Sequence, residues 1–153
     1  MSVLYKIGFI DAVFSNFNSL YGESNEYQIN RYNEAFDKFK NRFSVKEAYV
    51  ASSSGRAEII GNHTDHNGGK VISCAISLDT LAMFLPRDDG KICVVSEGYK
   101  DMEVEVFGDK TYPLGTSLAL IKGVVEGFKA RSYNVGGFNA YFTSNVLGGA
   151  GIS

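Results

Sequence analysis

Two short polar segments hold most of the residues that could do chemistry in this chain of 153 residues. The first segment, Gly61 to Gly69, contains both histidines, two asparagines and Asp65. Amide, imidazole and carboxylate groups pair readily with hydroxyls and phosphates, and a segment with few apolar atoms to bury is typical of a binding loop on a rigid scaffold. Arg56 lies just before the segment, at the start of an apolar run that resembles a strand.

Metal binding is the competing interpretation of this loop, because His63, Asp65 and His66 are zinc-type ligands at short spacing. Three ligands within four residues would need an open geometry, and the chain has no third histidine to complete the set. A carboxylate that accepts hydrogen bonds from sugar hydroxyls needs no further ligand, so we expect no metal here. For His66 and Asn67, a cap within the loop is the simpler role.

Arg56 has two possible roles. It could be a structural arginine that pairs with Glu58 or Asp65. Alternatively, its fixed fork and permanent charge could act on a phosphoryl group during transfer. Spacing along the sequence leaves both roles open.

The second segment runs from Asn145 to Ser153 and includes Gly148, Gly149 and Gly151. A strand that enters a glycine-rich turn commonly leads into a helix whose N-terminal amides hold phosphate. No Gly-Lys-Ser or Gly-Lys-Thr follows, so this is not a Walker loop. The helix itself would lie beyond Ser153, so the chain reads as cut rather than complete.

Hydrophobic periodicity predicts the elements that must position these segments. We expect helices over 9–21 and from Asn25 to Phe43, strands over 47–53 (continuing through 57–61), 71–85, 91–96, 102–107 and 138–144, and a helix capped by Thr116 or Ser117. Helices at the front, followed by a mostly antiparallel sheet with a covering helix, make an α+β domain.

Several finer expectations follow from the same pattern. In the strand 71–85, ended by Pro86, the even-numbered apolar positions should be buried and Asp79 should face solvent. Cys74 should be a small buried hydrophobe. Gly123 and Gly127, one helical turn apart, should allow close packing of their helix on the sheet.

Composition excludes several classes of protein. The chain is 44% hydrophobic and only 21% charged, which argues against disorder. A net charge of −2 supplies no basic field for nucleic acid or an anionic membrane surface. The first ten residues form neither a signal peptide nor a membrane span. We therefore expect a cytoplasmic protein that binds neither nucleic acid nor membrane.

Two motifs carry a family resemblance. The stretch from Gly55 to His66 resembles the galactokinase signature G-R-V-N-L-I-G-E-H-T-D-Y, and especially a bacterial variant with G-N-H-T-D-H. The stretch from Leu147 to Ser153 is similar to the start of the second motif, G-x-G-L-S-S-S-A. Phe17 to Gly22 also resembles the family's N-terminal helix, which ends in an aromatic residue and glycine. The chain is thus identified as similar to galactokinases, within the superfamily of galactokinase, homoserine, mevalonate and phosphomevalonate (GHMP) kinases.

The resemblance implies a fold and a reaction. Residues 1–153 would form the N-terminal domain of the GHMP kinase fold, like domain 2 of ribosomal protein S5, without its C-terminal domain. The parent enzyme would transfer a phosphoryl group from ATP, with Mg²⁺, to the anomeric hydroxyl of galactose. Arg56 would stabilise that group, and the sugar would be bound by Asn62, His63 and Asp65. The ATP phosphates would lie on Gly148, Gly149, Gly151 and Ser153.

The resemblance also implies what this chain lacks. The catalytic base, most Mg²⁺ ligands and the second domain would follow Ser153, so we expect an inactive N-terminal fragment. Asn62 replaces the usual glutamate and Ser117 replaces a common aromatic near the adenine, so sugar preference and the base pocket could differ from the family pattern. Two alternatives remain: a non-catalytic, galactose-sensing regulator of the same fold, and a small metal-binding protein built on the loop at His63.

Overall fold

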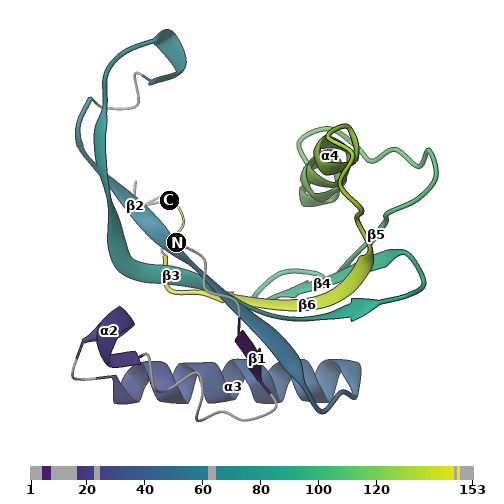
Figure 1. The fold of residues 1–153 in the computed structure, drawn as a ribbon, viewed down its shortest axis with the longest axis horizontal. Coiled ribbons are helices and arrows are strands. Elements are labelled where there is room, and N and C mark those ends of the chain that lie inside the picture. The colour runs from purple at the N-terminus through teal and green to yellow at the C-terminus, as the bar shows by residue number, and fades with distance from the viewer. Residues whose placement is uncertain (1–4, 8–16, 23–24, 62–64, 147, 149–153) are drawn as a thin grey trace.

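The computed structural model describes residues 5–7, 17–22, 25–61, 65–146 and 148 (Figure 1). Its elements, in chain order, are β1 (Tyr5–Ile7), α2 (Phe17–Tyr21), α3 (Glu26–Phe43), β2 (Ala48–Ile60), the 3-10 turn η1 (Asp65–Asn67), β3 (Ile72–Arg87), β4 (Lys91–Ser96), β5 (Met102–Glu105), α4 (Ser117–Lys129) and β6 (Gly137–Ser144). No helix within these residues is both long and apolar enough to cross a membrane.

The strands form one sheet in the order β1-β2-β3-β6-β4-β5. Neighbouring strands are antiparallel, except that β4 and β6 run parallel. In Figure 1 the sheet is curved, α2 and α3 lie along one face, and α4 lies on the other face at the β4–β5 end. The predicted α+β class and mostly antiparallel sheet are confirmed.

One hydrophobic core lies between α3 and the middle of the sheet. Tyr32, Ala35 and Phe39 recur at helical spacing and are buried against Leu81 and Met83 of β3. The helix ends at Ser44, which has left-handed backbone angles (φ 54°). This helix was predicted from its aromatic stripe, and the structure confirms it.

The second core lies under α4, whose Val125 is buried beside Ile92 of β4 and Val104 of β5. The helix begins at Thr116, whose side-chain oxygen accepts a hydrogen bond from the backbone N–H of Ala119 at 3.2 Å. The predicted cap is confirmed. The prediction for Gly123 was wrong, because that glycine is exposed and open space lies where its Cβ would be.

The prediction of which face of β3 is buried was wrong. Asp79, expected to face solvent, is only 2% exposed, and the neighbouring odd positions Leu81 and Met83 are fully buried. The odd positions face α3, and Arg31 of that helix neutralises the carboxylate. At the start of the strand Cys74 is exposed rather than buried, because neither helix covers that part of β3 in Figure 1.

Pro86 does not end β3. It lies within the strand, opposite Phe138 of β6, one residue before the last paired position, Arg87. A proline tolerates this place because its missing N–H matters least at the end of a ladder.

Asp79 is the centre of a buried polar network that joins four elements. Its carboxylate accepts hydrogen bonds from Arg31 of α3, Tyr21 of α2 and Ser52 of β2. The Tyr21 hydroxyl also lies 2.8 Å from the Tyr32 hydroxyl. Burial, together with the hydrogen bonds to Tyr32 and Asp79, raises the pKa of Tyr21 far above its ordinary value, so this phenol stays protonated.

Replacing Asp79 should therefore destabilise the fold strongly. Asp79→Ala leaves Arg31 as a buried, unpaired charge, and we expect a loss of about 3–5 kcal/mol in the free energy of unfolding. The matched control is Asp101→Ala, because Asp101 pairs with Arg42 through side chains that are about half exposed. That change should cost no more than about 1 kcal/mol. Urea denaturation of the two variants measures both values, and equal losses would contradict the role of Asp79.

Candidate functional site

The candidate site is built on a long two-stranded arm formed by the far halves of β2 and β3. Figure 1 shows this arm rising from the body of the sheet, with the connecting loop at its tip. Of the residues predicted to act in catalysis or to bind sugar or nucleotide, the structure describes Arg56, the backbone of Asp65, and Gly148. The side chain of Asp65 and all of Asn62, His63, Gly149, Gly151 and Ser153 lie outside the described residues.

Two irregularities in strand pairing shape the arm. The β2–β3 register shifts between Ser54 and Arg56 and again between Glu58 and Ile60. Such bulges add a residue to one strand and redirect the side chains beside it. In the first irregularity the buried Gly55, directly before Arg56, lies opposite three residues of β3, 76–78. The extra residues are therefore on β3 rather than on the strand that carries Arg56.

Gly61 closes the tip of the arm. Its φ is +113°, and an added Cβ would lie 2.7 Å from the carbonyl oxygen of Lys70 and 2.6 Å from Cγ1 of Val71. Only glycine suits both this backbone angle and this close approach. Gly61 therefore begins the polar loop at a point where its backbone packs closely against Lys70 and Val71, the two residues before β3.

The described part of the polar loop is a single 3-10 turn, Asp65–Asn67, followed by Gly68 with φ +75°. His66 in this turn is exposed. Within the described residues, no group of three or more histidine, cysteine, aspartate or glutamate side chains could hold a metal ion. His63 and the side chain of Asp65, which the metal interpretation requires, lie outside the described residues.

Arg56 forms an ion pair with Glu58, at 3.4 Å between Nη2 and Oε1. The arginine side chain is 47% exposed, whereas that of Glu58 is 10% exposed. Solvent therefore reaches the arginine side of the pair and screens it in part. The contact agrees with the structural role considered for Arg56.

The glycine-rich segment leaves the sheet at the base of the arm. β6 ends where Ser144 pairs with Thr80, and on the other side of β3, Ser54 pairs with Asp79. Two strand spacings, about 10 Å, therefore separate the end of β6 from β2 at a point two residues before Arg56. Arg56 itself pairs with Ala75, so it lies further out along the arm than the end of β6.

The sequence analysis missed the polar residues that hold this junction together. Arg31 and Asn145 both contact Asp79, and neither belongs to a recognised motif. One signal was present, a lone carboxylate in an apolar run. A carboxylate buried there needs a partner, but Arg31 falls between the apolar positions of its helix, so the sequence did not indicate which cation would pair with it.

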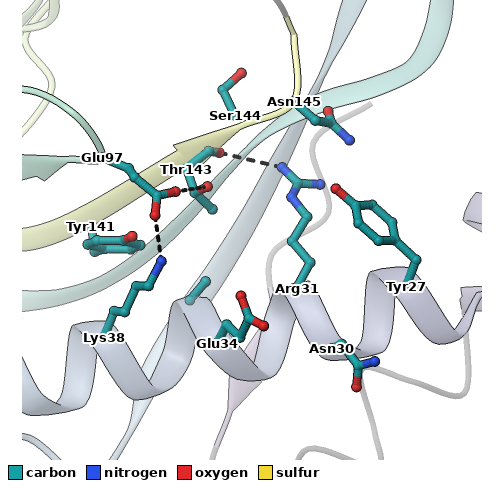
Figure 2. Close-up of a pocket in the computed structure, with 11 residues that line it drawn as sticks. Tyr27, Asn30, Arg31, Glu34, Lys38, Glu97, Tyr141, Thr143, Ser144 and Asn145 are labelled. Carbon is teal, nitrogen blue, oxygen red and sulfur yellow. Dashed lines mark hydrogen bonds and ion pairs between the residues drawn. The ribbon is translucent and has the colours of Figure 1, made fainter.

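A pocket of about 460 Å³ opens beside this junction, between α3 and the end of β6 (Figure 2). Arg31 and Asn145 lie at one end of it, and Lys38 reaches across to Glu97. The hydrogen bond from Lys38, followed by one from Thr143, lowers the pKa of Glu97. The pocket wall is therefore a set of ion pairs and hydrogen bonds that are already satisfied.

Comparison with known proteins identifies the arm. Residues 37–86 match the family model of the galactokinase galactose-binding signature. This match contains all of β2, the polar loop and all of β3 except Arg87. Within this chain, the segment 37–86 is thus similar to the galactose-binding signature of galactokinases.

Two solved structures confirm the fold. The chain resembles Lactococcus lactis galactokinase, solved in complex with galactose, with a TM-score of 0.59 and 22% identity over 94% of this chain. It resembles Methanococcus jannaschii mevalonate kinase with a TM-score of 0.52 and 15% identity over 67% of this chain. These matches cover 33% and 34% of the two kinases, so the chain spans about one third of their length.

The geometry of Gly61 predicts how substitution would affect the arm. In Gly61→Ala, the left-handed angle and the contacts with Lys70 and Val71 both oppose the new methyl group. Gly68→Ala is the matched control, because Gly68 has a positive φ but no atom within 4 Å of an added Cβ. The control should cost about 1–2 kcal/mol.

Hydrogen exchange measures the difference. Amides over 56–60 and 72–75 should exchange at least about tenfold faster in Gly61→Ala than in Gly68→Ala, while those of α3 stay unchanged. Equal exchange in the two variants would show that the tip does not depend on the close approach at Gly61.

Proposed function

We propose that this chain is the N-terminal part of a galactokinase, which transfers a phosphoryl group from ATP to the anomeric hydroxyl of galactose. The observation that carries the proposal is the coincidence of the galactose-binding signature with one structural unit, the β2–β3 arm and its loop. A sequence signature that spans one hairpin and its connecting loop belongs to a binding element rather than to scattered core positions.

In this proposal the loop at the tip of the arm binds the sugar. Asn62, His63 and Asp65 supply an amide, an imidazole and a carboxylate, which together can accept hydrogen bonds from sugar hydroxyls and donate hydrogen bonds to them. Gly61 fixes the start of the loop against Lys70 and Val71. Because Asn62 has no charge where the common family form has glutamate, the preference among sugar hydroxyls can differ from that form.

Arg56 acts on the phosphoryl group. Its present partner is Glu58, at 3.4 Å, and the arginine side of this pair is about half exposed to solvent. Charge-assisted hydrogen bonds from a guanidinium to phosphate oxygens are stronger and bidentate. The same side chain can therefore rest on Glu58 and turn to the transferring group, where charge stabilisation is most of the catalysis.

The glycine-rich segment receives the nucleotide. Gly148 is exposed, and no atom lies within 4 Å of the place where its Cβ would be. Open space beside the backbone is what a phosphate-binding turn requires, so Gly148, Gly149, Gly151 and Ser153 fit this role. Mg²⁺ bound with ATP would neutralise phosphate charge, and we assign it no ligand in this chain.

The location of the enzyme is part of the proposal. Cys74 and Cys93 are both free, and Cys74 is exposed. Free cysteines suit the reducing cytoplasm, where thiols are kept reduced.

The sugar site is tested by Asp65→Ala in the complete protein. Removing one partner from a site built for hydroxyls leaves other polar groups unpaired, so the dissociation constant for galactose should rise by about 10- to 100-fold. His66→Ala is the matched control from the same turn and should change it by less than about threefold. Calorimetric titration gives both values.

Turnover measured on the same preparations separates the candidate functions. The complete protein should consume ATP only when galactose is present. The 153-residue chain should show no galactose-dependent consumption of ATP. Galactose binding without turnover would favour the sugar-sensing regulator. Unchanged galactose affinity in Asp65→Ala would remove the sugar site, and stoichiometric zinc in the purified protein would favour the metal-binding alternative.

A second variant tests Arg56. Arg56→Lys keeps the charge and loses the fork, so turnover in the complete protein should fall about 100-fold. Galactose affinity and melting temperature should stay close to those of the unmodified protein. Arg42→Lys, which changes an exposed arginine paired with Asp101, is the control. A loss of activity that follows the folded fraction would instead make Arg56 structural.

A further inference from the structure

At the end of β6 the chain leaves the sheet, just before the glycine-rich segment. The β3–β6 ladder runs from Arg87 opposite Gly137 to Thr80 opposite Ser144, so the next pair would be Asp79 and Asn145. In a regular ladder that pair would exchange two hydrogen bonds between main-chain groups.

Only one of these hydrogen bonds is regular. The backbone N–H of Asn145 donates to the carbonyl oxygen of Asp79 at 3.2 Å. The backbone N–H of Asp79 donates instead to the side-chain oxygen Oδ1 of Asn145, at 2.7 Å. The side chain has replaced the main-chain carbonyl, and that carbonyl is free to leave the sheet. Asn145 thus ends the strand while it stays attached to it.

The residue to which Asn145 is attached cannot shift easily. Asp79 is 2% exposed, and its carboxylate is held by Arg31, Tyr21 and Ser52. Arg31 also donates from Nη2 to the carbonyl oxygen of Asp79 at 3.1 Å. Moving Asp79 would expose the buried ion pair or leave Arg31 buried without its partner, and either change costs free energy. The attachment point of Asn145 is therefore held by a buried network of hydrogen bonds.

The neighbouring residues turn the chain in the same place. The Ser144 side-chain oxygen accepts a hydrogen bond from the backbone N–H of Val146 at 3.1 Å. Arg31 reaches the carbonyl oxygen of Thr143 at 3.5 Å, as Figure 2 shows. Three consecutive residues, from Thr143 to Asn145, are thus tied to the Arg31–Asp79 pair or to the turn that follows.

We propose that Asn145, fixed by the Arg31–Asp79 pair, is a positioning residue for nucleotide binding. It sets the direction in which the chain enters the segment from Gly148 to Ser153. The inference rests on the proposed function, in which that segment holds the phosphates of ATP. Asn145 itself touches no phosphate; it acts through the direction of the backbone. Preorganised backbone donors bind an anion with less ordering cost than mobile ones, so loosening the exit should weaken nucleotide binding.

The test measures affinity for Mg-ADP and for galactose separately in the complete protein. In Asn145→Ala the Mg-ADP dissociation constant should rise about tenfold, while that for galactose changes less than about twofold. Thr80→Ala is the matched control, because it removes an exposed side-chain hydrogen bond with Ser144 one step along the same ladder. The control should change neither affinity.

Each outcome decides the inference. Unchanged Mg-ADP affinity in Asn145→Ala overturns it. A joint fall in both affinities and in melting temperature also overturns it, because Asn145 would then be only structural. An unmodified protein that binds galactose and no Mg-ADP overturns both the inference and the nucleotide part of the proposed function. A protein that binds Mg-ADP without phosphorylating galactose ends the proposed function alone, and the Asn145→Ala affinity still decides the positioning role.

Discussion

The ion pair between Arg31 and Asp79 is the contact on which the arrangement of α3, β3 and the end of β6 depends. A buried pair of this kind adds little net stability compared with apolar residues of the same size, but losing one partner costs several kcal/mol. Its value here is geometric. Because the carboxylate also accepts from Tyr21 and Ser52, one position of β3 is fixed relative to two helices and a neighbouring strand.

Away from that contact, helices cover only one face of the sheet at a time, and the outer part of the β2–β3 arm is covered by none of the described helices. The two cores cover opposite faces of the sheet, and the arm continues past both of them. Its described tip leaves large apolar side chains exposed, among them Ile59, Ile60 and Ile72, by 64%, 62% and 57%. Exposed apolar groups that cluster in this way commonly mark a contact surface.

Two arginines in this chain show how burial decides the role of one residue type. Arg31 is 9% exposed and its partner 3%, so the pair is fixed in place. Arg56 is 47% exposed, although its partner Glu58 is only 10% exposed. The first arginine is held in a buried network, whereas the second is open to solvent, as the phosphoryl-binding role proposed for it requires. The distinction rests on solvent access, because both are arginines beside carboxylates.

The sequence alone determined the elements whose signal is local. The aromatic stripe from Tyr32 to Phe39 specified α3, Thr116 specified the start of α4, and the residues around Gly61 specified the galactose-binding signature. Only the tertiary structure decided which face of β3 is buried. Alternation gives a strand two faces but does not say which one meets a helix. The sequence pattern therefore predicted an exposed Asp79, whereas in the structure α3 places Arg31 against it. The contact of Asn145 with Asp79 depends on the pairing of β6 with β3, which the sequence does not specify.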